Sequence, residues 1–115
     1  MIDIKTEILS FSKLENNWDC YGAVPTNSII CEKANSFIDK IGEWKDKITD
    51  VFPNPHGTLN IEWINDKGEK ASLEIGLSGY SYFVKRIDKE VILVDSKNNI
   101  VDNYDTFLEN LKTLF

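Results

Sequence analysis

The chain has 115 residues, of which 42% are apolar and 11% aromatic, and its formal net charge is −6. These values predict one folded domain over residues 1–115 and exclude a disordered or low-complexity chain. The longest apolar runs are far shorter than the ~20 residues that cross a bilayer, and the basic residues are too scattered for a phosphate-binding surface. Direct nucleic-acid and membrane binding are therefore not expected. A basic protein partner would be attracted by the net charge, although acidity also simply favours solubility.

Two amphipathic helices are predicted in the N-terminal half. Residues 4–18 and 30–48 each carry apolar side chains three and four positions apart. Pro25 and a polar cap within residues 26–28 mark the start of the second helix. Gly42 lies inside the second helix, where it costs about 1 kcal/mol relative to alanine and marks a close contact or a weak point.

Beyond Asp50 the apolar period changes from helical to alternating. Residues 51–57 contain Pro53 and Pro55 and are predicted to form a connector without regular pairing. Asp102 or Asn103 is the predicted cap of a C-terminal helix. Four antiparallel strands and this helix are predicted over residues 58–64, 71–77, 80–85, 90–95 and 104–115.

This order of elements predicts an α+β fold, with two N-terminal helices and one C-terminal helix packed on one face of an antiparallel sheet of about four strands. The face toward the helices is predicted to carry Leu59, Ile61, Trp63, Leu73, Ile75 and Leu77. The opposite face, predicted to meet water or a partner, carries Asn60, Glu62, Ser72, Glu74, Ser81, Phe83 and Lys85.

Residues that could carry chemistry are few. The two cysteines, Cys20 and Cys31, are expected to be free thiols because the chain lacks a secretion-type leader, which also suggests a cytoplasmic location. With His56 as the single histidine, no zinc site is expected, and no metal or cofactor is predicted. Cys20 and His56 form the one conceivable thiol–imidazole pair, but the neighbouring Asp19 carboxylate disfavours a thiolate. We therefore predict that the protein is not an enzyme.

The segment NWDCYGAVP admits two interpretations. As a corner, it reverses the chain at Gly22 and Pro25, while the Asp19 carboxylate accepts hydrogen bonds from backbone N–H groups. Trp18 then ends the apolar stripe of the first helix, and Tyr21 buries its ring at the edge of the core. Alternatively, Trp18, Asp19 and Tyr21 form a presented patch of aromatics beside an acid, which is typical of binding hot spots.

Two stretches, residues 14–25 and 53–63, together resemble small uncharacterised bacterial proteins that carry an "NWDGYGA…P…G…EW" pattern. This chain has Cys20 where that pattern has a glycine. Some of these proteins are encoded beside toxin or mobile-element genes, so the resemblance implies an accessory role such as immunity or antitoxin activity. The matching positions are Trp18, Asp19, Tyr21, Gly22, Ala23, Pro25, Gly57, Glu62 and Trp63.

The sequence thus predicts a non-enzymatic binding protein, an immunity protein or antitoxin that neutralises a basic toxin by direct binding. The predicted contacts are Asp19, Tyr21, Glu62 and Glu74, supported by Trp18, Gly22, Pro25 and Trp63. Glu62 has the alternative of a surface ion pair with Lys85 or another cation. The runner-up is a mobile-element protein that binds a nucleotide signal in a pocket between the corner and the sheet, and a hydrolase using Cys20 and His56 is a third possibility.

Overall fold

The protein is an α+β structure built on one antiparallel sheet. The computed structural model describes residues 3–115, and its sheet has five strands in the order β1-β2-β3-β4-β5. Every strand pairs with its neighbours in the chain, so the sheet is a simple meander. The strands are β1 (Asp50–Pro53), β2 (Leu59–Ile64), β3 (Lys70–Ile75), β4 (Tyr80–Lys85) and β5 (Ile92–Ser96).

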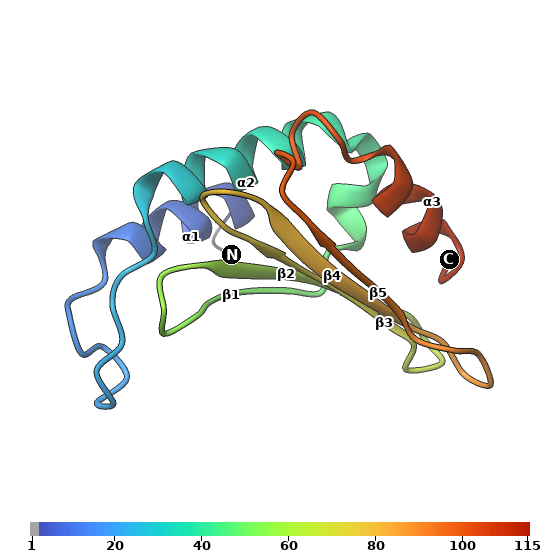
Figure 1. Cartoon of the computed structure of the whole chain (residues 1–115), viewed down its shortest axis with the longest axis horizontal. Coiled ribbons are helices and arrows are strands. Elements are labelled where there is room, and N and C mark those ends of the chain that lie inside the picture. The colour runs from blue at the N-terminus through green and yellow to red at the C-terminus, as the bar shows by residue number, and fades with distance from the viewer. Residues whose placement is uncertain (1–2) are drawn as a thin grey trace.

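The helices lie on one side of this sheet (Figure 1). They are α1 (Ile4–Ser10) with a 3-10 turn η1 (Phe11–Lys13), α2 (Ser28–Lys40), a 3-10 segment η2 (Gly42–Lys47) and α3 (Asp105–Lys112). None of the helices within residues 3–115 is long and apolar enough to cross a membrane.

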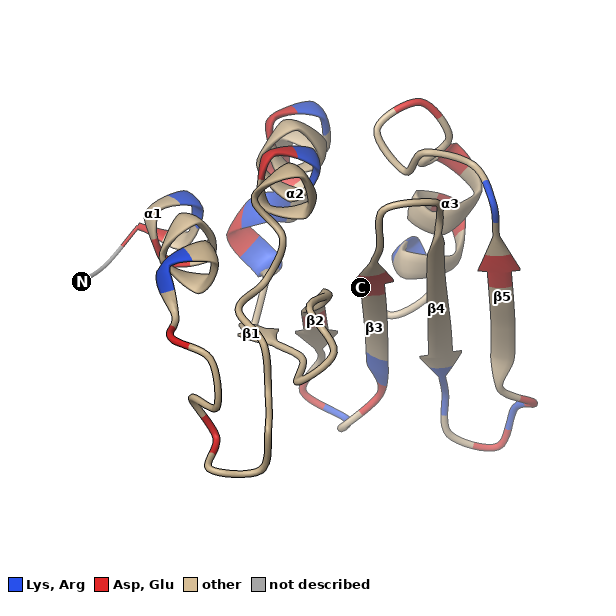
Figure 2. Cartoon of the chain, turned by 60° about the vertical axis from the view of Figure 1, so that its left-hand side comes forward, with Lys and Arg blue, Asp and Glu red and all other residues tan. Residues whose placement is uncertain are grey.

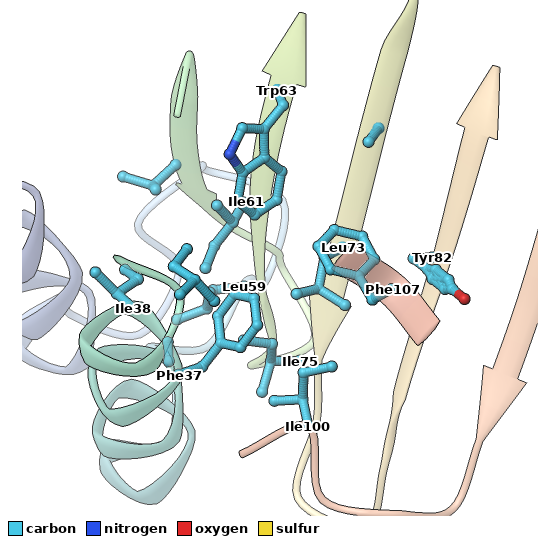
Figure 3. Close-up of a cluster of buried hydrophobic side chains, with 14 of the residues drawn as sticks. Phe37, Ile38, Leu59, Ile61, Trp63, Leu73, Ile75, Tyr82, Ile100 and Phe107 are labelled. Atoms are coloured by element: carbon cyan, nitrogen blue, oxygen red, sulfur yellow. The ribbon is translucent and has the colours of Figure 1, made fainter. Parts of the chain in front are cut away.

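The core lies between the helices and the sheet, and Trp63 and Phe107 are among its buried side chains (Figure 3). Trp63 is fully buried on β2, and its indole Nε1 donates to the backbone oxygen of Trp44 at 2.9 Å. The ring of Phe107 on α3 lies 5.4 Å from that of Trp63 and 4.9 Å from that of Tyr82, centroid to centroid. Phe37 of α2 meets the same Phe107 ring at 6.1 Å. Aromatic contacts from one side chain therefore join α2, α3 and two strands.

The first helix is shorter than predicted. Its α-helical part ends at Ser10, and after η1 the backbone of Leu14 is extended. Leu14 nevertheless packs against the core. Its spacing from the apolar residues of α1 is therefore helical although its own backbone is extended. Trp18 consequently stands in a loop, which returns to the first helix where Thr26 N–H donates to the carbonyl of Phe11 at 3.1 Å.

The second helix begins as predicted but ends early. The side chain of Asn27 caps it by accepting from Ile29 N–H at 2.8 Å. Gly42 has a φ of +60°, the left-handed conformation that commonly ends helices, so it acts as a stop and not as an interior residue. Trp44 and Ile48 still pack against the core from the following 3-10 segment, which explains why the helical spacing extends beyond the helix.

The sheet has one strand more than predicted, because Asp50–Pro53 pairs with β2. Pro53 is tolerated because it ends an edge strand opposite Leu59. Leu77, predicted in the core, lies in the turn after β3 and is 53% exposed. The C-terminal helix begins after Tyr104 without a side-chain cap, so neither Asp102 nor Asn103 has the predicted capping role.

Candidate functional site

The loop of residues 14–27, here called the corner loop, is held by its own side chains. Asp19 Oδ1 accepts from the backbone N–H groups of Tyr21 at 2.8 Å and of Ala23 at 3.0 Å. Asn17 Oδ1 accepts from Gly22 N–H at 2.7 Å. The Asp19 carboxylate therefore has the predicted turn-stabilising role.

The corner loop is also tied to the turn between β1 and β2. Trp18 Nε1 donates to the carbonyl of Val24 at 2.7 Å, and Val24 N–H donates to the carbonyl of Pro55 at 2.9 Å. On this fixed frame Tyr21 is 92% exposed, which contradicts the expectation that its ring lies at the edge of the core. The segment is thus a corner that also presents an aromatic side chain to solvent.

Cys20 occupies a backbone conformation that favours glycine, since its φ is +66°. We expect Cys20→Gly to leave the free energy of unfolding unchanged or to raise it by up to about 1 kcal/mol, because relief of the strained φ offsets the added freedom of the unfolded chain. Cys20→Val should lower it by more than about 1 kcal/mol, because a β-branched residue tolerates positive φ poorly. Urea denaturation measures both, with Cys20→Ser as the control; a clear loss of stability in Cys20→Gly would contradict this explanation.

The sheet surface away from the helices, here called the open face, is defined by Asn60, Glu62, Ser72, Glu74, Ser81, Phe83, Leu93 and Asp95. Glu62 lies on this face but is only 7% exposed. Ser72 Oγ donates to its carboxylate at 2.9 Å, and Lys70 Nζ lies 3.1 Å from it. The predicted ion pair of Glu62 therefore exists, with Lys70 in place of Lys85. Glu62 is a positioning group within the sheet surface and has little area left for a partner.

Glu74 is the more accessible of the two glutamates and is held at one end of the open face. His56 Nε2 lies 2.8 Å from its Oε2, and the Thr58 hydroxyl donates to the same oxygen. Burial raises the pKa of Glu74, but the hydrogen bonds from Thr58 and His56, with the charge of His56, outweigh burial and lower this pKa below the ordinary value of 4.5. Glu74 is therefore ionised at neutral pH.

The lowered pKa of Glu74 predicts a specific acid sensitivity. A carboxyl group whose pKa is lower in the folded than in the unfolded state stabilises the fold above its unfolded pKa, and this stabilisation is lost as the pH falls through the folded pKa. Between pH 6 and pH 3 the free energy of unfolding should thus fall less in Glu74→Gln than in the wild-type protein. Denaturation at the two pH values tests this, with Glu109→Gln on α3 as an exposed control; equal pH dependence in Glu74→Gln and the wild type would contradict it.

The contacts of His56 do not form a nucleophile relay. The same atom, His56 Nε2, lies 2.8 Å from Glu74 and 3.0 Å from Thr58 Oγ1, whereas a catalytic triad uses one ring nitrogen for the nucleophile and the other for the acid. Cys20 stands in the corner loop, and no hydrogen bond joins it to His56 in the part of the chain described. Residues 3–115 also contain no group of three His, Cys, Asp or Glu side chains placed to hold a metal ion.

A shallow hollow of about 340 Å³ lies on the open face over β3, β4 and β5. Glu74 and Asp95, here called the acidic pair, flank Ser81 in the strand register. Phe83 and Leu93 stand beside them as directly paired residues of β4 and β5, and Leu93 is 76% exposed. An acidic edge next to exposed apolar surface suits a group that combines a positive charge with an apolar stem.

Sequence reasoning overlooked Leu93 and Asp95. Their alternation with Ile92 and Val94 was the available signal, because Ile92 and Val94 pack against the core and leave Leu93 and Asp95 on the other face.

Comparison of the chain with protein-family models, curated proteins and solved structures found no match. The functional argument therefore depends on the geometry of the open face and the corner loop.

Proposed function

We propose that this protein is a non-enzymatic binding protein that docks on a basic protein partner through its open face and so neutralises that partner. The observation that carries the proposal is the combination of the acidic pair with the exposed apolar surface of Leu93 on a sheet face that no described helix covers. The partner that fits best is a toxin whose active surface is basic, which makes this chain an immunity protein or antitoxin acting in the cytoplasm.

Electrostatics support a basic partner in two ways. The net charge of −6 attracts a cationic protein over long range and speeds the encounter. At short range, the lowered pKa keeps Glu74 charged at neutral pH. Leu93 adds an apolar contact of the kind that excludes water around a central charge pair.

Tyr21 is the proposed second contact. Its ring is exposed while its backbone is fixed by the Asp19 carboxylate, so binding a partner does not have to order the backbone at this position. In this proposal Asp19 and Glu62 act as positioning residues, and Tyr21 and Glu74 make the contacts.

Coexpression with the products of neighbouring genes tests the proposal. We expect one neighbour, basic and growth-inhibitory when expressed alone, to be neutralised and to copurify with this protein. Leu93→Lys should weaken that complex by about tenfold or more, because it places a positive charge in an interface that receives a cation. Leu9→Lys is the matched control, since Leu9 is an exposed leucine on α1, 45% accessible. Absence of any binding neighbour, or equal loss of affinity in the two variants, would count against the proposal.

A further inference from the structure

The two edges of the sheet differ in their free backbone groups. In the β3–β4 hairpin, Gly76 N–H donates to the carbonyl of Gly79, which fixes the alternation of hydrogen-bonded pairs along β4. Continued into β5, this alternation directs the N–H and C=O groups of Ile92, Val94 and Ser96 toward β4. The backbone groups of Leu93 and Asp95 consequently point outward, at the free edge.

The β1 edge lacks such free donors. Asn54 N–H donates to the carbonyl of Thr58, so the same alternation turns Val51 and Pro53 outward. Val51 N–H is already bound by the side chain of Asp50 at 2.9 Å, and proline has no N–H. Within residues 3–115, by contrast, no hydrogen bond engages the outward N–H groups of Leu93 and Asp95. Sheet extension is therefore blocked at β1 and open at β5.

On the open-face side of the sheet, the charged side chains of β3, β4 and β5 are ordered by charge. Figure 2 shows acidic positions on β3 and β5 toward one end of the strands, and basic positions on β3 and β4 toward the other. These are the acidic pair at one end and Lys70 and Lys85, directly opposite each other, at the other. Leu93 stands next to Phe83 between the two ends. A strand added to β5 thus meets an acid at Asp95 and an apolar side chain two residues away at Leu93.

We infer that β5 accepts an extended segment of the basic partner as a sixth strand, with a lysine or arginine beside Asp95 and an apolar residue beside Leu93. This inference rests on the proposed function, because it names the part of the same partner that pairs with β5, at the edge of the open face. Main-chain hydrogen bonds to Leu93 and Asp95 provide the attachment, and alternate side chains of the segment provide the selectivity. Lys97 follows β5, two residues beyond Asp95. Its positive charge disfavours a second lysine or arginine at the neighbouring position of the bound segment.

A synthetic peptide provides the test without the partner. The probe is a short acetylated and amidated peptide in which an arginine and a valine stand two positions apart among threonines. In an amide NMR titration we expect saturable shifts in β5 and slower hydrogen exchange at the N–H groups of Leu93 and Asp95. The same peptide with glutamate in place of arginine should bind about five- to tenfold more weakly, and Asp95→Lys should reverse that preference. Asp102→Lys, an exposed acid outside the sheet, is the matched control.

Three outcomes would overturn the inference: no saturable shifts at peptide concentrations of several millimolar, shifts without added protection of Leu93 and Asp95, or pairing of β5 with a second copy of the chain. The two proposals fail separately. If a neighbouring gene product binds and Leu93→Lys weakens it, but the β5 amides stay unprotected in that complex, the proposed function stands and the strand addition does not. If the peptide pairs with β5 but no gene product binds, the strand site stands and the proposed function does not.

Discussion

Trp63→Ala is expected to lower the free energy of unfolding by about 3–5 kcal/mol, the range for truncating a large buried aromatic. Trp63 is fully buried, and its ring contacts Phe107, which in turn contacts Phe37 and Tyr82. The substitution also removes the hydrogen bond from the indole to the carbonyl of Trp44, which leaves that acceptor without its partner. Urea denaturation followed by circular dichroism measures the change.

Tyr21→Ala is the matched control for Trp63→Ala. It removes an aromatic ring that is 92% exposed, so the free energy of unfolding should change by less than about 0.5 kcal/mol. A loss of less than about 2 kcal/mol in Trp63→Ala, or equal losses in the two variants, would show that the centre of the core lies elsewhere. Trp63→Phe should give an intermediate loss, since it keeps a ring beside Phe107 but cannot donate to Trp44.

Gly79→Ala should destabilise the protein by about 3 kcal/mol, at the upper end of the usual effect of overpacking. A Cβ atom at Gly79 would lie 2.0 Å from the carbonyl oxygen of Ser96 and 3.0 Å from the Cα of Lys97. Both atoms belong to the backbone, so no side-chain rotation can relieve the clash. The end of β5 must move away from β4, and we expect the amide NMR signals of residues 92–97 to shift the most.

Gly76→Ala in the same turn is the control for Gly79→Ala. A Cβ at Gly76 meets its nearest atom, the carbonyl oxygen of Gly79, at 3.4 Å, which is an ordinary contact. Its cost should be about 1 kcal/mol or less. Equal destabilisation by the two substitutions would mean that the turn itself, and not the approach of β5, is the source of the effect.

Strand positions could be predicted well from the sequence. The predicted strands over residues 58–64 and 80–85 match β2 and β4 to within one residue, and the Asn27 cap is one of the three predicted candidates. Period-two patterns locate strands because every second side chain of a strand points into the core and must be apolar. This requirement does not depend on the conformation of the segments that flank the strand. The α+β class with an antiparallel sheet followed from these elements.

Helix ends and the edge strand were not predictable from apolar spacing. Leu14, Trp44 and Ile48 pack against the core from extended or 3-10 backbone, so their spacing resembles helix where there is none. The edge strand β1 was hidden by Pro53, because the sequence does not show that this proline faces outward. In each case tertiary contacts, and not local preference, decide the backbone.

The candidate site was predictable only in part. Alternation placed Glu62 and Glu74 on the face away from the helices, but their different accessibility depends on Lys70 and His56, which come from other segments of the chain. The sequence left two interpretations of Tyr21 open, buried at the edge of the core or presented to solvent, because turn chemistry determines the backbone path and not the direction of an unpaired side chain; the structure shows it exposed. The importance of Leu93 depends on β5 being an edge, which is a property of the whole sheet.

The meander order of the strands has a consequence for how the molecule forms. Hairpins between consecutive strands close short loops, so sheet assembly has a small entropic barrier and should be fast. The seating of Phe107 against Trp63 and Phe37 spans much longer stretches of chain and must wait for the C-terminus. Because α3 follows all five strands in the chain, the hairpins can pair before Phe107 is in place, and α3 then closes the core over Trp63.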